Sequence, residues 1–289
     1  MYIQLYTMKT YLVPIDFSRA SVHAAEFAAA LSHQTDVEHI VLLNAYYVSV
    51  YESTLPNTDM VMLSTEEIEE NAADRLKKLE HLKTALYKHV RPGVEITTHL
   101  NHTHLVRAVV ENSIIYHADL VILGSIGNSS NSDYNIGSHV VKISKASPVP
   151  VIVVPPAYDF EKIHRIVVAC DFNKVTETVP LQELKKLLTR KKFELLVVNV
   201  DDSGKHIGGN TERLAEETAL YDMLKPFNPQ YFYINQKNII NGILQFAGDH
   251  DAQLVIALPH KYSFLQELLH TSVSIQLAKS SAVPVLLLK

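Results

Sequence analysis

The stretch HADLVILGS at residues 117–125 returns later in the chain as DAQLVIALP at residues 251–259. A second pair, ASPVPVIVV at 146–154 and SSAVPVLLL at 280–288, is separated by the same number of residues. Because both pairs share one spacing, they align without a gap. The chain therefore contains an internal duplication, which indicates two copies of one structural unit.

Short apolar runs rich in β-branched residues alternate in each copy with segments of helical spacing. Such runs have the length of buried strands, and their alternation with helices predicts right-handed crossovers and a parallel sheet covered on both faces. The expected strands are 11–15, 40–47, 94–100, 120–123 and 149–154 in the first copy, and 163–169, 195–200, 230–234, 254–257 and 283–288 in the second. The expected helices of the first copy are 18–33, with Ser18 as N-cap, 66–89, 105–116 and 140–146.

These patterns predict an α/β fold of two tandem doubly wound domains, each with a five-stranded parallel sheet of order 3-2-1-4-5. The 289 residues and 47% apolar content suffice for two cores. The stretch PPAYDFEK at 155–162 is interpreted as an exposed connector because of its prolines and polar residues. The predicted domains are residues 1–156 and 157–289.

Net charge and cysteine content bear on the expected partners and location of the protein. The formal net charge of −5 gives no electrostatic reason to expect nucleic acid or an anionic membrane surface. No apolar run approaches the ~18 residues of a membrane span, and the first residues do not resemble a secretory signal. The single cysteine, Cys170, cannot form an intramolecular disulfide. We expect a cytoplasmic protein.

The glycine-rich stretch GSIGNSSNSDYNIGS at 124–138 follows the fourth expected strand. Gly124 and Gly127 would let the backbone approach a phosphate, while Gly137 and Ser138 open the next helix, whose N-terminus attracts anions. A strand-to-helix connection with glycines in ordinary turns is the alternative. Asp16 favours a ligand site, because it ends the first strand, next to the fourth, where a carboxylate can bind ribose or adenine groups.

The pattern Gly124-x2-Gly127-x9-Gly137-Ser138 resembles the nucleotide motif of the universal stress protein family. The stretches VPIDFS at 13–18 and SPVPVIVVPP at 147–156 also resemble that family. The resemblance covers both copies and implies a tandem protein with the adenine nucleotide alpha hydrolase-like fold. It further implies ATP or a related adenine nucleotide as ligand, with Mg²⁺ or Mn²⁺ bridging phosphate oxygens. The implied binding residues are Pro14, Ile15, Asp16, Ala45, Gly124, Ser125, Ile126, Gly127, Asn128, Gly137 and Ser138.

The second copy departs from this pattern. VPIDFS returns as VACDFN at 168–173, so Asp16 has Asp171 as its counterpart. The glycines do not return, because the equivalent positions hold Leu258, Lys261 and Thr271, and only Ser138 keeps its identity, as Ser272. Side chains would fill the volume that phosphates need, so we expect the second site to be lost or altered. The family resemblance implies a pseudo-symmetric pair with the fifth strands joined, and leaves a further homodimer open.

A histidine cluster in HLNHTH at 99–104 has two interpretations. His99, His102 and His104 could bind zinc, but no carboxylate or cysteine completes a recognisable ligand spacing. A solvated loop is the alternative and the preferred interpretation.

Three functional hypotheses follow from these patterns. The first is an ATP-binding stress or signalling protein with no dedicated catalytic group. The second is a slow metal-dependent ATPase in which Asp16 or Asp133 orients water. The third is a nucleotide-independent scaffold that binds another ligand or a partner protein.

Overall fold

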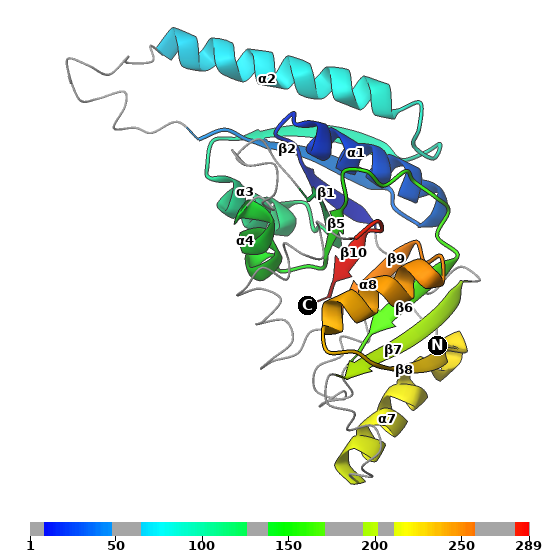
Figure 1. Cartoon of the computed structure of the whole chain (residues 1–289). Helices are drawn as coiled ribbons and strands as arrows, with labels where there is room; N and C mark the ends of the chain where they lie inside the picture. Colours follow the sequence, from blue (N-terminus) through cyan, green and yellow to red (C-terminus); the bar gives the residue numbers. More distant parts are fainter. Residues whose placement is uncertain are drawn as a thin grey trace, which may run out of the picture.

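The computed structural model describes residues 9–47, 65–125, 138–170, 193–201, 211–257 and 281–288. Its strands form one sheet in the order β3-β2-β1-β4-β5-β10-β9-β6-β7-β8 (Figure 1). Each half therefore has the expected order 3-2-1-4-5. The strands are β1 (Thr10–Pro14), β2 (His39–Ala45), β3 (Glu95–Asn101), β4 (Leu120–Gly124), β5 (Val151–Val154), β6 (Arg165–Ala169), β7 (Glu194–Asp201), β8 (Gln230–Asn235), β9 (Leu254–Ala257) and β10 (Val285–Leu287).

The two halves are joined through their fifth strands. Within each half every pairing is parallel, whereas β5 and β10 pair antiparallel, with Ile152 opposite Leu286. This pairing removes an exposed edge from each half, because the backbone groups of β5 and β10 bond to each other. The expected joining of the fifth strands is confirmed.

Helices cover both faces of the sheet (Figure 1). In the first half α1 and α2 lie on one face and α3 and α4 on the other. The N-cap prediction for α1 is confirmed, since the Ser18 hydroxyl accepts a hydrogen bond of 3.2 Å from the backbone N–H of Ser21. The α-helices are α1 (Arg19–Leu31), α2 (Thr65–Leu86), α3 (Leu105–Ile115), α4 (Ser138–Ala146), α7 (Thr211–Leu224) and α8 (Ile239–Asp249), and short 3-10 turns follow α1 (Ser32–Gln34) and α7 (Lys225–Phe227).

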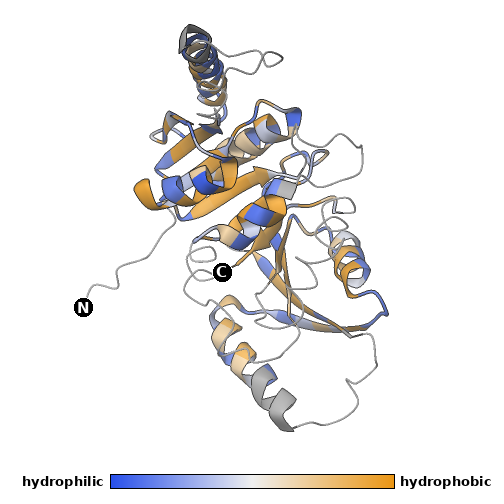
Figure 2. Ribbon diagram, turned by 90° about the vertical axis from the view of Figure 1, so that its left-hand side faces the viewer, coloured by the Kyte–Doolittle hydropathy of each residue, from blue (hydrophilic) through white to orange (hydrophobic). Residues whose placement is uncertain are grey.

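The apolar core extends through the join between the halves. One cluster of buried side chains on the α1 face includes residues of β1, β5, β6 and β10, so it belongs to both halves. Figure 2 shows the apolar strands enclosed between helices whose outer surfaces are more hydrophilic. On the other face α3 and α4 cover the first half and α8 the second. On α2, Leu79 and Leu86 are buried in the cluster on the α1 face, whereas Leu76 is 40% exposed.

The connector between the halves is exposed at its polar residues, while its aromatic residues pack against α1. Tyr158 is buried, and its ring lies edge-on to Phe27 of α1 with centroids 6.1 Å apart. Phe160 makes a similar contact with Phe27 at 5.6 Å. Gln34 exchanges two hydrogen bonds, of 3.1 and 2.8 Å, with the backbone of Ile163. The interpretation as an exposed connector therefore holds for the polar residues of this stretch and is wrong only for its aromatic side chains, which pack against α1.

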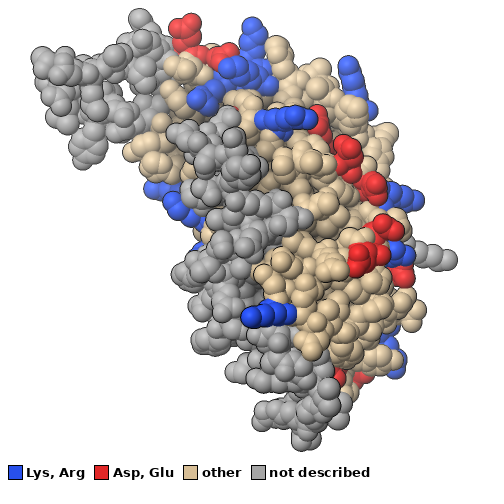
Figure 3. Space-filling view, in the orientation of Figure 1, with Lys and Arg blue, Asp and Glu red and all other residues tan. Residues whose placement is uncertain are grey.

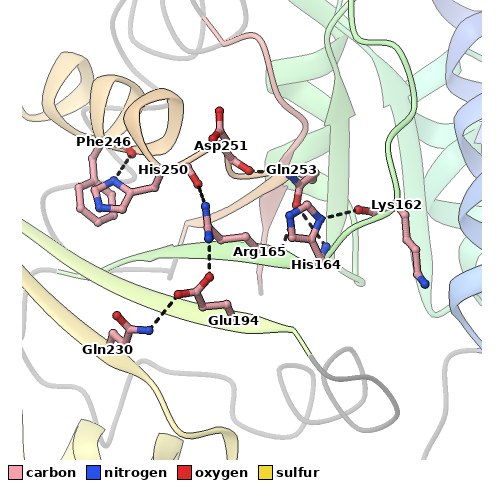
Figure 4. A network of polar contacts seen from close by, with 9 residues as sticks. All are labelled: Lys162, His164, Arg165, Glu194, Gln230, Phe246, His250, Asp251 and Gln253. Carbon is pink, nitrogen blue, oxygen red and sulfur yellow. Dashed lines mark hydrogen bonds and ion pairs between the residues drawn. The ribbon is translucent and has the colours of Figure 1, made fainter.

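The duplication also repeats a clamp at the start of each first strand. The carboxylate of Asp119 accepts hydrogen bonds from the backbone N–H groups of Lys9 and Thr10, at 2.7 and 3.1 Å. In the second half the side-chain oxygen of Gln253 accepts from His164 and Arg165, at 3.2 and 2.9 Å (Figure 4). Each clamp satisfies two backbone donors at an open strand end.

Arg165 belongs to a polar network at this strand end (Figure 4). Its guanidinium donates to Glu194 at 2.6 Å and to the backbone carbonyl of His250. Gln230 donates to the other oxygen of Glu194 at 2.9 Å. These bonds, that from Arg165 above all, hold the pKa of the Glu194 carboxyl below its ordinary value. Arg165, the first residue of β6, thus connects this strand to β7 and to the C-cap residue of α8.

The surface that Figure 3 shows carries charges of both signs. Basic and acidic side chains of the described residues lie interspersed, and neither sign forms a large uniform patch on this face. None of the helices in the described ranges combines the length and apolar character that crossing a membrane requires.

Candidate functional site

The carboxyl ends of β1, β2 and β4 meet at one edge of the first half. β1 pairs with β2 on one side and with β4 on the other. This brings together three of the predicted positions, because Asp16 follows β1, Ala45 ends β2 and Gly124 ends β4. Pro14 and Ile15 are buried in the wall between them.

Part of the predicted site lies outside the described residues. This applies to Ile126, Gly127, Asn128 and Gly137. Ser138 is the first residue of α4, although its side chain is not described. The phosphate half of the expected cradle therefore stays a prediction.

Asp16 lies in a tight turn between β1 and α1. Its Oδ1 atom accepts a hydrogen bond of 2.9 Å from the backbone N–H of Ser18. Phe17, between them, has a φ of 63°, in the left-handed region that non-glycine residues rarely adopt. The helix cap at Ser18 and the Asp16 hydrogen bond hold this uncommon backbone in place. The same turn fixes the carboxylate at the strand end.

Asn44, one residue before Ala45, was not among the residues predicted from the sequence. Its side chain is buried and donates a hydrogen bond of 2.6 Å to the carbonyl of Ile15, which links β2 to the residue before Asp16. The second half repeats this bond from Asn199 to the carbonyl of Cys170, at 2.7 Å. The available signal was a polar residue at the same place in two apolar strands, VLLNA at 41–45 and LVVNV at 196–200.

Gly124 has a packing role that was not predicted from the sequence. A Cβ atom at this position would lie 2.4 Å from the carbonyl oxygen of Ala20 in the first turn of α1. The missing side chain therefore permits close packing of β4 against α1, and the close backbone approach seen here is to the protein itself. A phosphate contact at Gly124 stays a prediction.

Ser125 supplies a hydroxyl at the same edge that has no partner among the described residues. Its backbone N–H donates to the carbonyl of Val154 at 3.0 Å, which ties it to the end of β5. The side chain is fully buried, and its Oγ atom has no hydrogen-bond partner among the described residues. An unpaired buried hydroxyl costs about 1–3 kcal/mol. A polar ligand atom at this edge would remove that cost.

The three histidines of the 99–104 stretch are paired with tyrosines. His99 lies in β3 and shares a hydrogen bond of 3.1 Å with the hydroxyl of Tyr116. The ring of His104 is stacked on Tyr47, with centroids 3.8 Å apart, and His102 lies edge-on to Tyr46. The described residues contain no group of three His, Cys, Asp or Glu side chains arranged to hold a metal ion. The solvated-loop interpretation is wrong for His99, which is part of the sheet.

The free energy of unfolding of the first half is expected to depend on pH because of His39 and His99. Both rings lie beside Tyr116, and His39 is also bonded to the hydroxyl of Thr97 at 2.8 Å. Burial lowers the pKa of both imidazoles from the ordinary value of 6.5, and for His39 the nearby Glu95 opposes this shift. The folded state therefore favours the neutral rings.

We expect the free energy of unfolding to decrease as the pH falls from 7.5 to 5.5. An imidazole whose folded-state pKa is lowered binds protons more readily when unfolded, so its contribution is fully present above pH 6.5 and is lost as the pH falls toward the folded-state value. Urea unfolding at the two pH values measures this decrease. A variant with both His39→Gln and His99→Gln cannot titrate there and should show a smaller decrease, whereas an equal decrease would contradict the assignment.

The comparisons with known proteins agree with this fold. The sequence profile of the universal stress protein family matches residues 8–155 and again residues 162–289. A universal stress protein from Archaeoglobus fulgidus DSM 4304 is 18% identical, with a TM-score of 0.71 over 99% of this chain and 98% of that chain. No curated protein matches the sequence.

Two further solved structures are similar over nearly the whole chain. A functionally unknown protein from Pseudomonas aeruginosa PAO1 is 13% identical, with a TM-score of 0.58 over 98% of this chain and 92% of that chain. A putative universal stress protein from Pseudomonas aeruginosa UCBPP-PA14 is also 13% identical, with a TM-score of 0.57 over 98% and 93%. At these identities the structures show the fold alone, while the two profile matches together span most of the chain. The chain therefore belongs to the universal stress protein family and carries two of its domains in tandem.

Proposed function

We propose that the first half binds an adenine nucleotide, ATP or a related compound, at the carboxyl ends of β1, β2 and β4. The second half acts as a pseudo-symmetric partner without the same site. The protein would serve in stress response or signalling, with nucleotide binding rather than catalysis as its activity. The expected cytoplasmic location stays a prediction.

The buried hydroxyl of Ser125 is the observation that carries this proposal. It directly follows Gly124 at the end of β4, the strand next to β1, and it has no partner among the described residues. In open parallel sheets ligands bind beyond the carboxyl ends of the strands, close to the point where strand order reverses. The order β3-β2-β1-β4-β5 reverses between β1 and β4, where Asp16 and Ser125 lie.

The residues at this edge suit the sugar and base of a nucleotide. Asp16 would accept hydrogen bonds from ribose or adenine groups, and Ala45 would meet adenine through its backbone. Gly127, Gly137 and Ser138 would hold the phosphates by backbone N–H groups and a hydroxyl at the start of α4. Mg²⁺ or Mn²⁺ would bridge phosphate oxygens.

Calorimetric titration of the full chain with ATP and Mg²⁺ tests the proposal. We expect one site per chain. Asp16→Asn should weaken binding about 10- to 100-fold, since it replaces a charged acceptor by a neutral one yet keeps the oxygen that accepts from Ser18.

The duplication offers a matched control for this experiment. Asp171→Asn makes the same change at the equivalent position of the second half, and it should leave the affinity unchanged. Two sites per chain, or an equal loss in both variants, would contradict the assignment of the site to the first half. Absence of any binding to the wild-type chain would contradict the proposed function itself.

A further inference from the structure

The half-buried arginines of the described chain differ in how their guanidinium groups are satisfied. Arg91 donates to the carbonyls of Ser32 and Val37, at 3.1 and 2.6 Å. Arg165 donates to Glu194 and to a backbone carbonyl, as Figure 4 shows. Both groups are thus held by protein acceptors, which is the usual condition of a structural arginine.

Arg75 of α2 lacks comparable acceptors. Its one hydrogen bond with a described residue, from NH1 to the side-chain oxygen of Asn44, is long at 3.4 Å. Its Nε atom is buried and has no hydrogen-bond partner among the described residues, and none of the ion pairs found there includes Arg75. A buried guanidinium N–H without an acceptor is costly, so an anion would stabilise this arrangement.

The position of Arg75 is fixed by aromatic stacking. Its guanidinium carbon lies 4.2 Å from the ring centroid of Tyr46, the residue directly after Ala45. Stacking on a ring face restrains the guanidinium plane and leaves the N–H groups at its edge able to donate. The fork of N–H groups in arginine matches the oxygens of a phosphate.

Arg75 also lies at the candidate site. Asn44, its hydrogen-bond partner, donates to the carbonyl of Ile15, which directly precedes Asp16. One turn later on α2, the ammonium of Lys78 lies 5.9 Å from the ring centroid of Phe17, the residue after Asp16. Two basic side chains of α2, Arg75 and Lys78, therefore lie close to the turn that carries Asp16, on the side of β2 rather than β4.

We propose that Arg75 is a ligand-contacting, specificity-determining residue that binds an oxyanion of the nucleotide. This inference rests on the proposed function and adds a cationic contact from α2 to it. The site would then favour phosphorylated ligands over the corresponding nucleosides. Arg75 would accomplish this directly, through donors that no described protein group occupies.

Calorimetric titrations with ATP and with adenosine separate a phosphate contact from a structural role. In Arg75→Met the stem keeps its length and loses its charge. We expect it to weaken ATP binding at least about tenfold and to change adenosine binding less than about twofold. Arg75→Lys keeps the positive charge but lacks the paired N–H groups of the guanidinium, so it should recover part of the lost ATP affinity.

Lys77→Met is the matched control, since it removes the same charge from an exposed position of α2. It should leave ATP binding unchanged. If Arg75→Met weakens ATP and adenosine equally, the residue acts only by supporting Asn44 and Tyr46, and the proposal is wrong. Unchanged ATP binding in Arg75→Met would also overturn it.

The proposed oxyanion contact of Arg75 can be tested even if the proposed nucleotide binding fails. If the wild-type chain binds neither ATP nor adenosine, nucleotide binding fails, and inorganic pyrophosphate becomes the probe. An increase in the melting temperature of the wild type with pyrophosphate, absent in Arg75→Met, would still support an oxyanion contact. No increase in the wild type would overturn the contact as well.

Discussion

Replacing Phe27 by alanine is expected to lower the free energy of unfolding of the whole chain by about 3–5 kcal/mol. Phe27 is only 1% exposed, and its ring packs edge-on against the rings of Tyr158 and Phe160 in the connector. Its removal leaves a cavity in an apolar cluster that includes buried residues from strands of both halves. Urea unfolding followed by far-UV circular dichroism measures the effect, and the transition should remain single because the cluster is shared.

A double-mutant cycle tests whether Phe27 acts through the connector. Phe27→Ala and Tyr158→Ala should couple by about 0.5–1.5 kcal/mol, because each removes the edge-to-face contact of the pair. Phe246 of α8 is the matched control, a buried phenylalanine of the second half in a different cluster. Phe246→Ala should cost a similar amount and add independently to Phe27→Ala. Independence of Phe27 and Tyr158 would contradict the description of the connector as part of the core.

The second large effect is expected at Gly124. In Gly124→Ala the new Cβ would lie 2.4 Å from the carbonyl oxygen of Ala20 and 2.6 Å from its carbonyl carbon, so the first turn of α1 must move. We expect a loss of about 1–3 kcal/mol in the free energy of unfolding, as for other overpacked sites. Since the turn with Asp16 leads into α1, nucleotide binding should weaken as well.

The control for Gly124 is a glycine with open space around it. Gly248 is exposed in the last turn of α8, and a Cβ there would meet nothing within 4 Å. Gly248→Ala should raise the free energy of unfolding by up to about 1 kcal/mol, because alanine favours a helix. The two substitutions are chemically identical, so opposite signs in urea unfolding would verify the close approach of β4 to α1. A gain of stability in Gly124→Ala would refute it.

The fold could be predicted from the sequence because its signals are local and occur twice. Strand lengths, the Ser18 cap and the repeated stretches fix element types and their order, and the structure confirms them. The packing of the connector's aromatic residues was missed for the opposite reason. The polarity of residues 155–162 is a local property, whereas the burial of Tyr158 depends on Phe27, more than a hundred residues earlier in the chain.

The candidate site was predictable only in outline. Asp16, Ala45 and Gly124 follow from the ends of strands, which any parallel sheet brings to one edge. Asn44 and Arg75 could not be assigned in the same way, because their roles depend on contacts between a strand and a helix separated by the undescribed residues 48–64. The packing role of Gly124 depends likewise on the distance between β4 and α1. The spacing of residues in a sequence does not give that distance.

The antiparallel join of β5 and β10 gives the molecule two opposite ends. The strands of the two halves run in opposite directions, so their carboxyl edges face away from each other. The edge with Asp16 and Ser125 therefore opens at one end of the sheet, while the corresponding edge of the second half opens at the other. A nucleotide and a partner protein could occupy the two ends at once without competing. Ser125 bonds to Val154, the last residue before the connector, so the candidate site is linked directly to the segment that leads into β6 of the second half.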